Sequence, residues 1–227
     1  YEQGRVFLKT DANQVRPTEV EYVAGLLSGN RQFKSWQQTA EPVDFYTIKG
    51  IVAALLATYQ LTDKVRYVAT ADFTEMHPGR TAAIYVGEYL VGLVGQVHPQ
   101  VAKAYHLKET YVFELDLAQI QSLPTKTLIA KPAPKFPEVT RDIALQVAET
   151  ITNADLVNAI YAKGGQYLVS VELFDVYAGS HIEKGQKSMA YTLTYLNEAA
   201  TLTEEEVTSA FDQVVAHLVT TFDAKVR

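Results

Sequence analysis

The sequence predicts an α+β protein of two domains, each built on a largely antiparallel sheet. In residues 1–122, short runs of β-branched and aromatic residues alternate with turn residues, and one clear helix lies among them. From residue 138 onward the elements follow the order β-α-β-β-α-β, which is the ferredoxin-like pattern. Four of the eight prolines fall within residues 124–137. Because proline removes backbone donors and disfavours helix, we expect a proline-rich linker at residues 123–137.

Bulk composition narrows the possible functions of the chain. Its 227 residues lack cysteine, which excludes disulfides, thiol catalysis and cysteine-bound zinc and fits a reducing, cytoplasmic setting. A formal net charge of -6 argues against a broad, nonspecific grip on nucleic acid, so any RNA contact should be local. No apolar run approaches the ~18 residues of a membrane span. The chain starts without Met and inside a strand-like run, which suggests a fragment of a longer protein.

The first domain combines five predicted strands with one amphipathic helix. A plausible N-cap, Asp44, precedes the helix. Apolar residues at helical spacing form its buried stripe, namely Ile48, Ile51, Val52, Leu55, Leu56 and Tyr59. The predicted strands are residues 5–9, 65–69, 81–87, 89–97 and 111–117.

The second domain has clearer boundaries. A strand at residues 140–147 leads to a helix whose start carries Thr152 and Asp155 in capping-box spacing, and Gly164 should end it. Strands at residues 167–177 and 187–195 follow. The last helix begins with Thr203 and Glu206, again in capping-box spacing, and a short strand closes the domain at residues 224–227. Both helices should cover one sheet face and leave the other free for a ligand or an RNA strand.

The end of the strand at residues 167–177 is unusual because Asp175 and Tyr177 close it, in the stretch LFDVYAG. By simple alternation both continue the parity of Val169, Val171 and Leu173 and would point toward the helices. A bulge or strand end near Phe174 is needed to free them. On anatomy alone, Tyr177 could instead cap the core and Asp175 could anchor the next turn.

Signals of catalysis are sparse. The five histidines show no metal-binding spacing, and neither a nucleophile elbow nor a phosphate-binding loop is present. Gly92 and Gly95 suggest plain strand geometry, and the pair His98-Pro99 suggests a helix start. The acidic run at residues 204–206 suits the first turn of a helix.

Several segments resemble one protein family. The stretches KFPEVTRDIAL, LFDVYAG, GQKSMAYTLTY, TLTEEEV and FDAKVR resemble the ferredoxin-fold anticodon-binding domain that ends the β subunit of bacterial phenylalanyl-tRNA synthetase. The stretches YEQGRVF, DFYTIKG, MHPGRTAAIYVG, VGLVGQVHP and YVFELDL, with the Trp of KSWQQ, resemble the synthetase-like module of the same subunit. The resemblance therefore covers nearly the whole chain.

This resemblance implies that residues 1–122 form a catalytically degenerate class II synthetase core. In the active copy, two arginines contact ATP and two glycines leave room for adenine. Here Leu8 and Gln119 stand at the arginine positions, and Glu114 and Asp116 stand at the glycine positions. Phosphoryl and adenylate chemistry needs positive charge, so this domain should not activate an amino acid.

For residues 138–227 the resemblance implies anticodon binding. The matching residues are Tyr177 as a stacking platform, Asp175 as an acceptor for a guanine edge and Ser188 as a second polar contact. Lys184 and Lys187, in the turn between the strands, would contact phosphate or remain solvated.

We therefore interpret the chain as a non-catalytic, C-terminal part of the β subunit, with neither a cofactor nor a metal of its own. The complete α2β2 enzyme would join phenylalanine to tRNA(Phe) in the cytoplasm with ATP and Mg²⁺, and the α subunit would carry the chemistry. One alternative is an intrinsically catalytic core, against which Leu8 and Gln119 argue. The other is a ferredoxin-like interaction or small-molecule-sensing module fused to a structural α+β domain.

Overall fold

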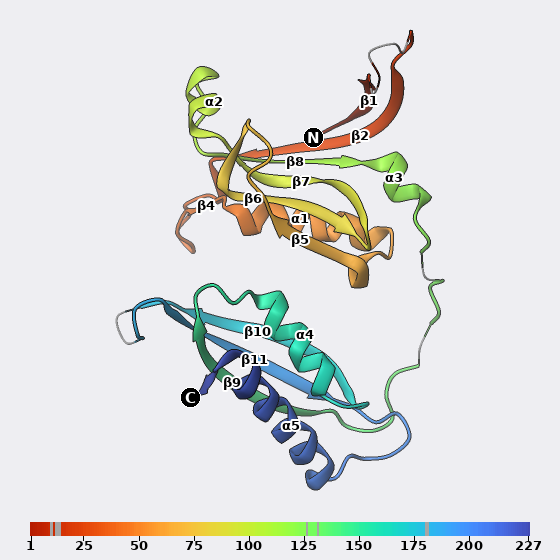
Figure 1. The fold of residues 1–227 in the computed structure, drawn as a ribbon, viewed down its shortest axis with the longest axis vertical. Coiled ribbons are helices and arrows are strands. Elements are labelled where there is room, and N and C mark those ends of the chain that lie inside the picture. The colour runs from red at the N-terminus through yellow and green to blue at the C-terminus, as the bar shows by residue number, and fades with distance from the viewer. Residues whose placement is uncertain (10, 12–14, 126, 131, 180–181) are drawn as a thin grey trace. The chain divides into compact units, whose positions relative to one another are not determined.

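A computed structural model describes residues 1–9, 11, 15–125, 127–130, 132–179 and 182–227. The chain is α+β with antiparallel sheets, and it divides into two compact units, Tyr1–Ile129 and Ala130–Arg227, each with its own core (Figure 1). Among the described residues, no helix combines the length and apolar character needed to cross a membrane.

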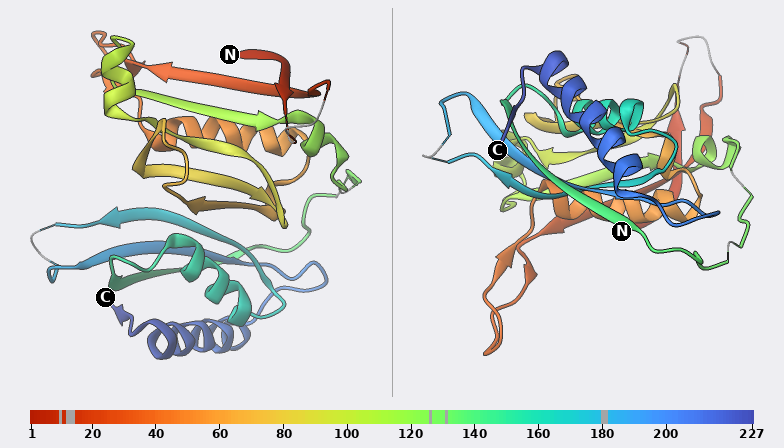
Figure 2. Two further views of the ribbon diagram at one scale, coloured as in Figure 1. Left: turned by 45° about the horizontal axis from the view of Figure 1, so that its top comes forward. Right: turned by 90° about the horizontal axis from the view of Figure 1, so that it is seen from below.

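The first unit is a six-stranded antiparallel sheet in the order β1-β2-β8-β7-β6-β5, with α1 packed across one face (Figures 1 and 2). A separate hairpin, β3–β4, precedes α1. The elements are β1 (Glu2–Leu8), β2 (Thr18–Ser28), β3 (Asn30–Gln32), β4 (Glu41–Pro42), α1 (Phe45–Thr58), the 3-10 turn η1 (Thr62–Lys64), β5 (Val65–Ala69), β6 (Met76–Val86), β7 (Tyr89–Val97), α2 (Pro99–Ala104), β8 (Thr110–Asp116) and α3 (Leu117–Ser122).

Helix α1 forms where its N-cap and apolar stripe predict it. The Asp44 carboxylate accepts the backbone N–H of Thr47 at 2.7 Å, which satisfies one of the free donors at the helix start. Ile48, Val52 and Leu56 are fully buried against the sheet. The prediction was wrong for Ile51, which is 42% exposed because it lies at the margin of the stripe.

Strand β2 was not among the predicted strands, although its eleven residues join the edge strand β1 to β8. The pair His98-Pro99 starts α2 as predicted, and the His98 ring nitrogen Nδ1 accepts the N–H of Gln100 at 3.2 Å.

The second unit has the four-stranded order β10-β11-β9-β12, and α4 and α5 cover the same sheet face (Figures 1 and 2). Its ferredoxin-like element order confirms the prediction, including the short last strand. The elements are β9 (Val139–Ala148), α4 (Asn153–Lys163), β10 (Leu168–Tyr177), β11 (Gln186–Tyr195), α5 (Glu204–Phe222) and β12 (Lys225–Val226).

Both predicted capping boxes form. The Thr152 hydroxyl accepts the N–H of Asp155 at 3.2 Å while the Asp155 carboxylate accepts the N–H of Thr152 at 2.9 Å. Thr203 and Glu206 repeat the arrangement at the start of α5. Gly164 is the C-cap of α4, as predicted. These local bonds fix where both helices begin and hence which stripe faces the sheet.

The proline-rich segment yields a prediction about domain independence. Limited proteolysis should cut between Leu123 and Pro137 and release a folded C-terminal piece, because each unit has its own buried core. Circular dichroism and thermal melting of the purified piece would check this. Cutting there that unfolds both halves would show that the boundary is wrong.

Candidate functional site

One irregularity in β10 decides which side chains reach the open face of the second sheet. Leu173 lies opposite Tyr191 in β11, but the next pair along is Asp175 with Ala190, so Phe174 is the extra residue of a bulge. The bulge falls near Phe174, where one was needed to free Asp175 and Tyr177 from the core side. Because a shift of one residue exchanges the two faces of a strand, Asp175 and Tyr177 leave the parity of Leu173.

The partners across the sheet show which face they join. Directly opposed residues share a face in an antiparallel pair. Val176 lies opposite Met189, which is buried in the core beneath the helices. Tyr177 lies opposite Ser188 and therefore points to the other face, which neither α4 nor α5 covers.

Two short rows of side chains cross this open face. The first runs from Tyr177 through Ser188 and Gln146 to Lys225 in β12. The second runs from Asp175 through the small residues Ala190 and Ala144. The rows therefore place the ring of Tyr177, the carboxylate of Asp175 and the hydroxyl of Ser188 beside two small alanine side chains.

The ring of Tyr177 lies over Gly179. A Cβ built on Gly179 would be 2.2 Å from the Tyr177 hydroxyl oxygen and 2.3 Å from Cζ, which is closer than any real contact. Tyr177 remains 39% exposed. The missing side chain at Gly179 therefore lets the ring rest against the backbone while one side stays open to solvent.

The two lysines predicted for this site lie in different surroundings. Lys184 is exposed in the turn between β10 and β11. Lys187 lies opposite Val147, a core residue, so it is on the helix-covered side of the sheet. There its charge adds to the bonds from Thr152 in lowering the pKa of Asp155. The structure brings Tyr177, Asp175 and Ser188 together, and it does not bring Lys187 to that group.

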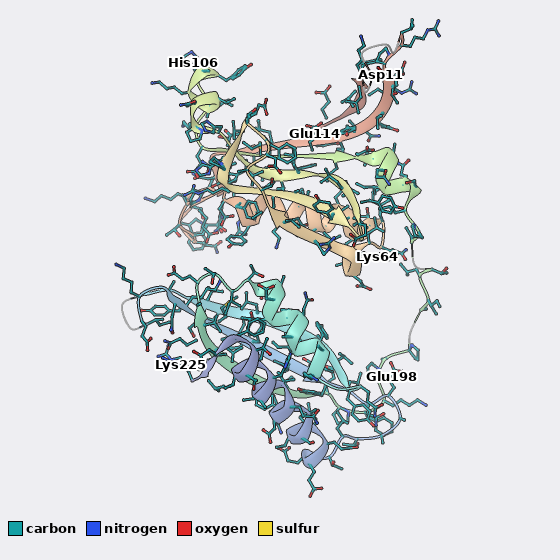
Figure 3. The ribbon with its side chains drawn as sticks, in the orientation of Figure 1. Asp11, Lys64, His106, Glu114, Glu198 and Lys225 are labelled. Atoms are coloured by element: carbon teal, nitrogen blue, oxygen red, sulfur yellow. The ribbon has the colours of Figure 1, made fainter. Side chains whose placement is uncertain are left out.

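A polar network beside the same row was missed at the sequence level. Gln146 Nε2 donates to Gln186 Oε1 at 2.5 Å, and Gln186 Nε2 donates to Glu183 Oε2 at 3.3 Å. The other oxygen of Glu183 pairs with Lys225 Nζ at 2.8 Å (Lys225 is labelled in Figure 3). Alternation within the strand TRDIALQV could have indicated the position of Gln146. Ile143, Leu145 and Val147 take the core side, so the polar Gln146 between them must face the other side of the sheet.

In the first unit, three of the four positions that the resemblance predicts to be degenerate share the sheet face opposite α1. Asp116 lies opposite Tyr22 and Glu114 lies opposite Ala24, whereas the core residue Leu115 lies opposite Val23. Leu8, paired with Thr18, continues the parity of Tyr22. Figure 3 labels Glu114 on this sheet.

The electrostatics of that face are negative. Burial, followed by the charges of Asp116 and Glu114, raises the pKa of the Tyr22 phenol above its usual value. Asp116 also has a local role, since its carboxylate caps α3 by accepting the N–H of Gln119 at 2.8 Å. Asp116 and Gln119 stand at two of the positions that the resemblance predicts to be degenerate, and here they form the start of a helix.

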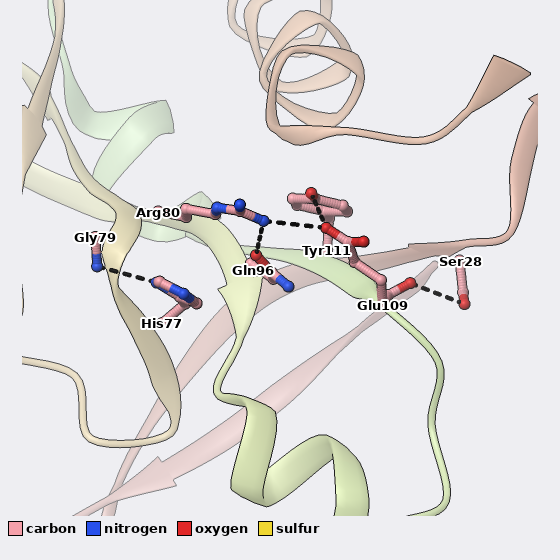
Figure 4. A network of polar contacts seen from close by, with 7 residues as sticks. All are labelled: Ser28, His77, Gly79, Arg80, Gln96, Glu109 and Tyr111. Carbon is pink, nitrogen blue, oxygen red and sulfur yellow. Dashed lines mark hydrogen bonds and ion pairs between the residues drawn. The ribbon is translucent and has the colours of Figure 1, made fainter.

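A network at the other end of this sheet holds an arginine (Figure 4). Arg80 Nη1 donates to Gln96 Oε1 at 2.9 Å and lies 3.2 Å from Glu109 Oε1, which also accepts the Tyr111 hydroxyl at 2.6 Å. Burial first, and then Glu109, raise the pKa of Tyr111 to about 12, so the phenol stays protonated as a donor. The guanidinium is therefore already paired, and the network joins β6, β7 and β8. Sequence reasoning did not single it out.

Metal-binding geometry is absent from the described ranges: no group of three or more His, Asp or Glu side chains in them could hold an ion. Gly92 and Gly95 serve close strand packing, because an added Cβ would lie 2.1 Å from the Glu114 carbonyl oxygen and 2.7 Å from the Arg80 carbonyl oxygen.

Comparison with known proteins gives consistent matches over the chain. Residues 1–117 match the family model described as phenylalanyl tRNA synthetase beta chain CLM domain, and residues 134–227 match the ferredoxin-fold anticodon binding domain. The chain is 76% identical over its whole length to the phenylalanine–tRNA ligase beta subunit of Latilactobacillus sakei, 52% to that of Lactiplantibacillus plantarum and 44% to that of Bacillus subtilis. It spans 28% of the length of each of these relatives.

The contact between Gly179 and Tyr177 gives a prediction. Gly179→Ala should tilt the tyrosine ring away from its resting place at little cost in stability, because the clashing atoms are the free end of a side chain. We expect a melting temperature close to wild type and altered ring-current shifts of residues near Tyr177 in NMR spectra. Gly4→Ala, where an added Cβ meets nothing within 4 Å, is the control. Unchanged spectra around Tyr177 would contradict the packing described.

Proposed function

Because this chain belongs to the phenylalanyl-tRNA synthetase β-chain family, we propose that it is a non-catalytic part of the β subunit of a phenylalanine–tRNA ligase. In the complete α2β2 enzyme, which acts in the cytoplasm, the α subunit joins phenylalanine to tRNA(Phe) with ATP and Mg²⁺. The present chain supplies recognition of the anticodon and a scaffold for the α subunit.

The observation that carries anticodon recognition is the bulge at Phe174, which brings Tyr177 and Asp175 to the open sheet face. Single-stranded loops are read by stacking splayed bases on aromatic rings and by hydrogen bonds to base edges. Tyr177 is the platform for one base. Asp175 accepts hydrogen bonds from a guanine edge, and Ser188 offers a second polar contact.

The charge of the chain fits a local mode of binding. A net charge of -6 provides no broad electrostatic attraction to RNA, so affinity must come from specific contacts. A base–aromatic stack contributes about 1–3 kcal/mol, which is a useful share for one residue. Lys184 is the proposed phosphate contact, because it is exposed in the turn between β10 and β11, whereas Lys187 lies on the helix-covered side of the sheet and is not assigned to the RNA.

The scaffold role is supported by exposed apolar side chains of the first unit. Phe33 and Trp36 in the β3–β4 hairpin are 73% and 92% exposed, and Tyr46 and Ile51 on α1 are 74% and 42% exposed. Exposed large aromatics are characteristic anchors of protein interfaces. We assign these side chains to contact with the α subunit.

ATP does not fit the face that carries Leu8, Glu114 and Asp116. A triphosphate needs cations, and this face presents two carboxylates and a leucine at the decisive positions. No catalytic step is therefore assigned to the chain.

The platform role predicts the behaviour of three substitutions in the α2β2 holoenzyme. Tyr177→Ala should weaken binding of the anticodon stem-loop by about 1–3 kcal/mol, because a stacking surface is lost. Tyr177→Phe should retain most of the affinity, because stacking needs the ring. Asp175→Asn should reduce the preference for guanine over adenine, because one acceptor becomes a donor. Fluorescence anisotropy with labelled stem-loops measures all three.

Thermal melts of the same variants separate this role from a structural one. A buried core aromatic would cost about 3–5 kcal/mol of stability on truncation. A large fall in the melting temperature of Tyr177→Ala, together with unchanged affinity for the stem-loop, would leave LFDVYAG as ordinary strand-end architecture.

The negative face of the first unit predicts that this chain alone binds no ATP. Calorimetric titration with Mg²⁺–ATP should give no saturable heat, whereas the holoenzyme, with its α subunit, should give a binding isotherm. Micromolar affinity for Mg²⁺–ATP in the isolated chain would overturn the assignment of this sheet as a non-catalytic copy.

A further inference from the structure

Gln146 lies in the same row of the open face as Tyr177 but one strand farther than Ser188. Neighbouring strands are about 4.8 Å apart, so Gln146 begins roughly 10 Å from the strand that carries Tyr177. Four-stranded sheets that bind RNA hold two or three successive bases side by side. A base that follows the one on Tyr177 would therefore lie over Gln146.

The hydrogen bonds around Gln146 have a fixed direction. A carboxylate only accepts, so Glu183 requires Gln186 to turn its NH₂ group toward it. The Gln186 oxygen then points the other way and accepts from Gln146 Nε2. Lys225 Nζ bonds the second oxygen of Glu183 and keeps that carboxylate in place. Glu183 thereby determines the orientation of both amides.

This orientation leaves Gln146 with a definite pattern for a ligand. One N–H is used by Gln186, while Oε1 and the second N–H have no partner among the described residues. An acceptor beside a donor matches the edge of adenine on which the 6-amino group donates and N1 accepts, in the same sense as the bidentate pairing of glutamine with adenine N6 and N7 in duplex DNA. Hypoxanthine presents the reverse pattern, since its O6 accepts and its N1–H donates.

We propose that Gln146 is a specificity-determining residue that reads an adenine next to the base held on Tyr177, and that Glu183 is the positioning residue that fixes its amide. The inference rests on the proposed anticodon role of this sheet face and adds the chemistry of a second base.

The test uses the holoenzyme and anticodon stem-loops in which each base adjacent to the guanine is varied in turn. Adenine is replaced by purine, which lacks the 6-amino group, and separately by hypoxanthine. In the wild type, one of these positions should lose about tenfold or more in affinity on loss of the amino group. In Gln146→Met, which keeps length and volume, the same replacement should change affinity less than twofold. An equal loss in both proteins would overturn the Gln146 assignment.

Glu183→Gln tests the positioning role with a readout that a structural role would leave unchanged. Its amide can donate as well as accept, so the chain of hydrogen bonds can reverse and Gln146 can turn its NH₂ group to the base. The ratio of affinities for adenine and hypoxanthine should fall severalfold at the position that Gln146 reads. Lys225→Met, which removes the ion pair but leaves Glu183 as an acceptor, should keep most of that preference. An unchanged ratio in Glu183→Gln would refute the positioning role.

Tyr177→Ala distinguishes failure of the inference from failure of the proposed function. If that substitution leaves stem-loop binding intact, the sheet face does not bind the anticodon and both proposals fall. If it weakens binding while the purine replacement costs the same in the wild type and in Gln146→Met, only the inference about Gln146 is wrong.

Discussion

The register of β10 is the constraint on which the rest of the second unit depends. Before the bulge, Val171 and Leu173 pack against the core beneath α4 and α5. After it, Asp175 and Tyr177 stand on the opposite face with Ala190 and Ser188. A regular strand would either bury the acid and the ring or expose the apolar residues, because side chains alternate with a period of two. Because of one extra residue, the odd-numbered side chains of β10 from Val171 onward face the core before the bulge and the open face after it.

The first unit is the proposed non-catalytic copy, in which the fold would persist while its charges do not suit the chemistry. Its six-stranded sheet packs one face against α1, and the other face carries Leu8, Glu114 and Asp116. Asp116 is tied to the helix start of α3, and Arg80 is paired with Glu109. The side chains that remain there stabilise local structure, which agrees with a module whose proposed use is its surface and not a reaction.

Sequence patterns predicted the second unit more completely than the first. Capping boxes and apolar stripes are local signals, so both helices and the order of strands could be predicted, and the parity of Asp175 and Tyr177 with Leu173 required a bulge near Phe174. Simple alternation was wrong for Val169, which it assigned to the core side. Val169 is 48% exposed, because a second register shift follows Leu168. The hydrogen bonds from Gln146 to Glu183, 37 residues apart by their numbers, could not be predicted from spacing, since only the pairing of β9 with β11 brings them together. The same reason hid the arginine network of the first unit.

We propose that the open face of the second sheet, at the end of β10, receives the anticodon. Photo-crosslinking tests it most directly. A stem-loop or full tRNA with 6-thioguanosine in place of the anticodon guanosine would be irradiated in complex with the holoenzyme, and the linked peptide would be identified by mass spectrometry. We expect a crosslink to the segment of β10 and β11 that contains Tyr177 and Ser188, and a strong reduction of this crosslink in Tyr177→Ala. Crosslinks confined to α4, α5 or the first unit, unchanged by that substitution, would contradict it.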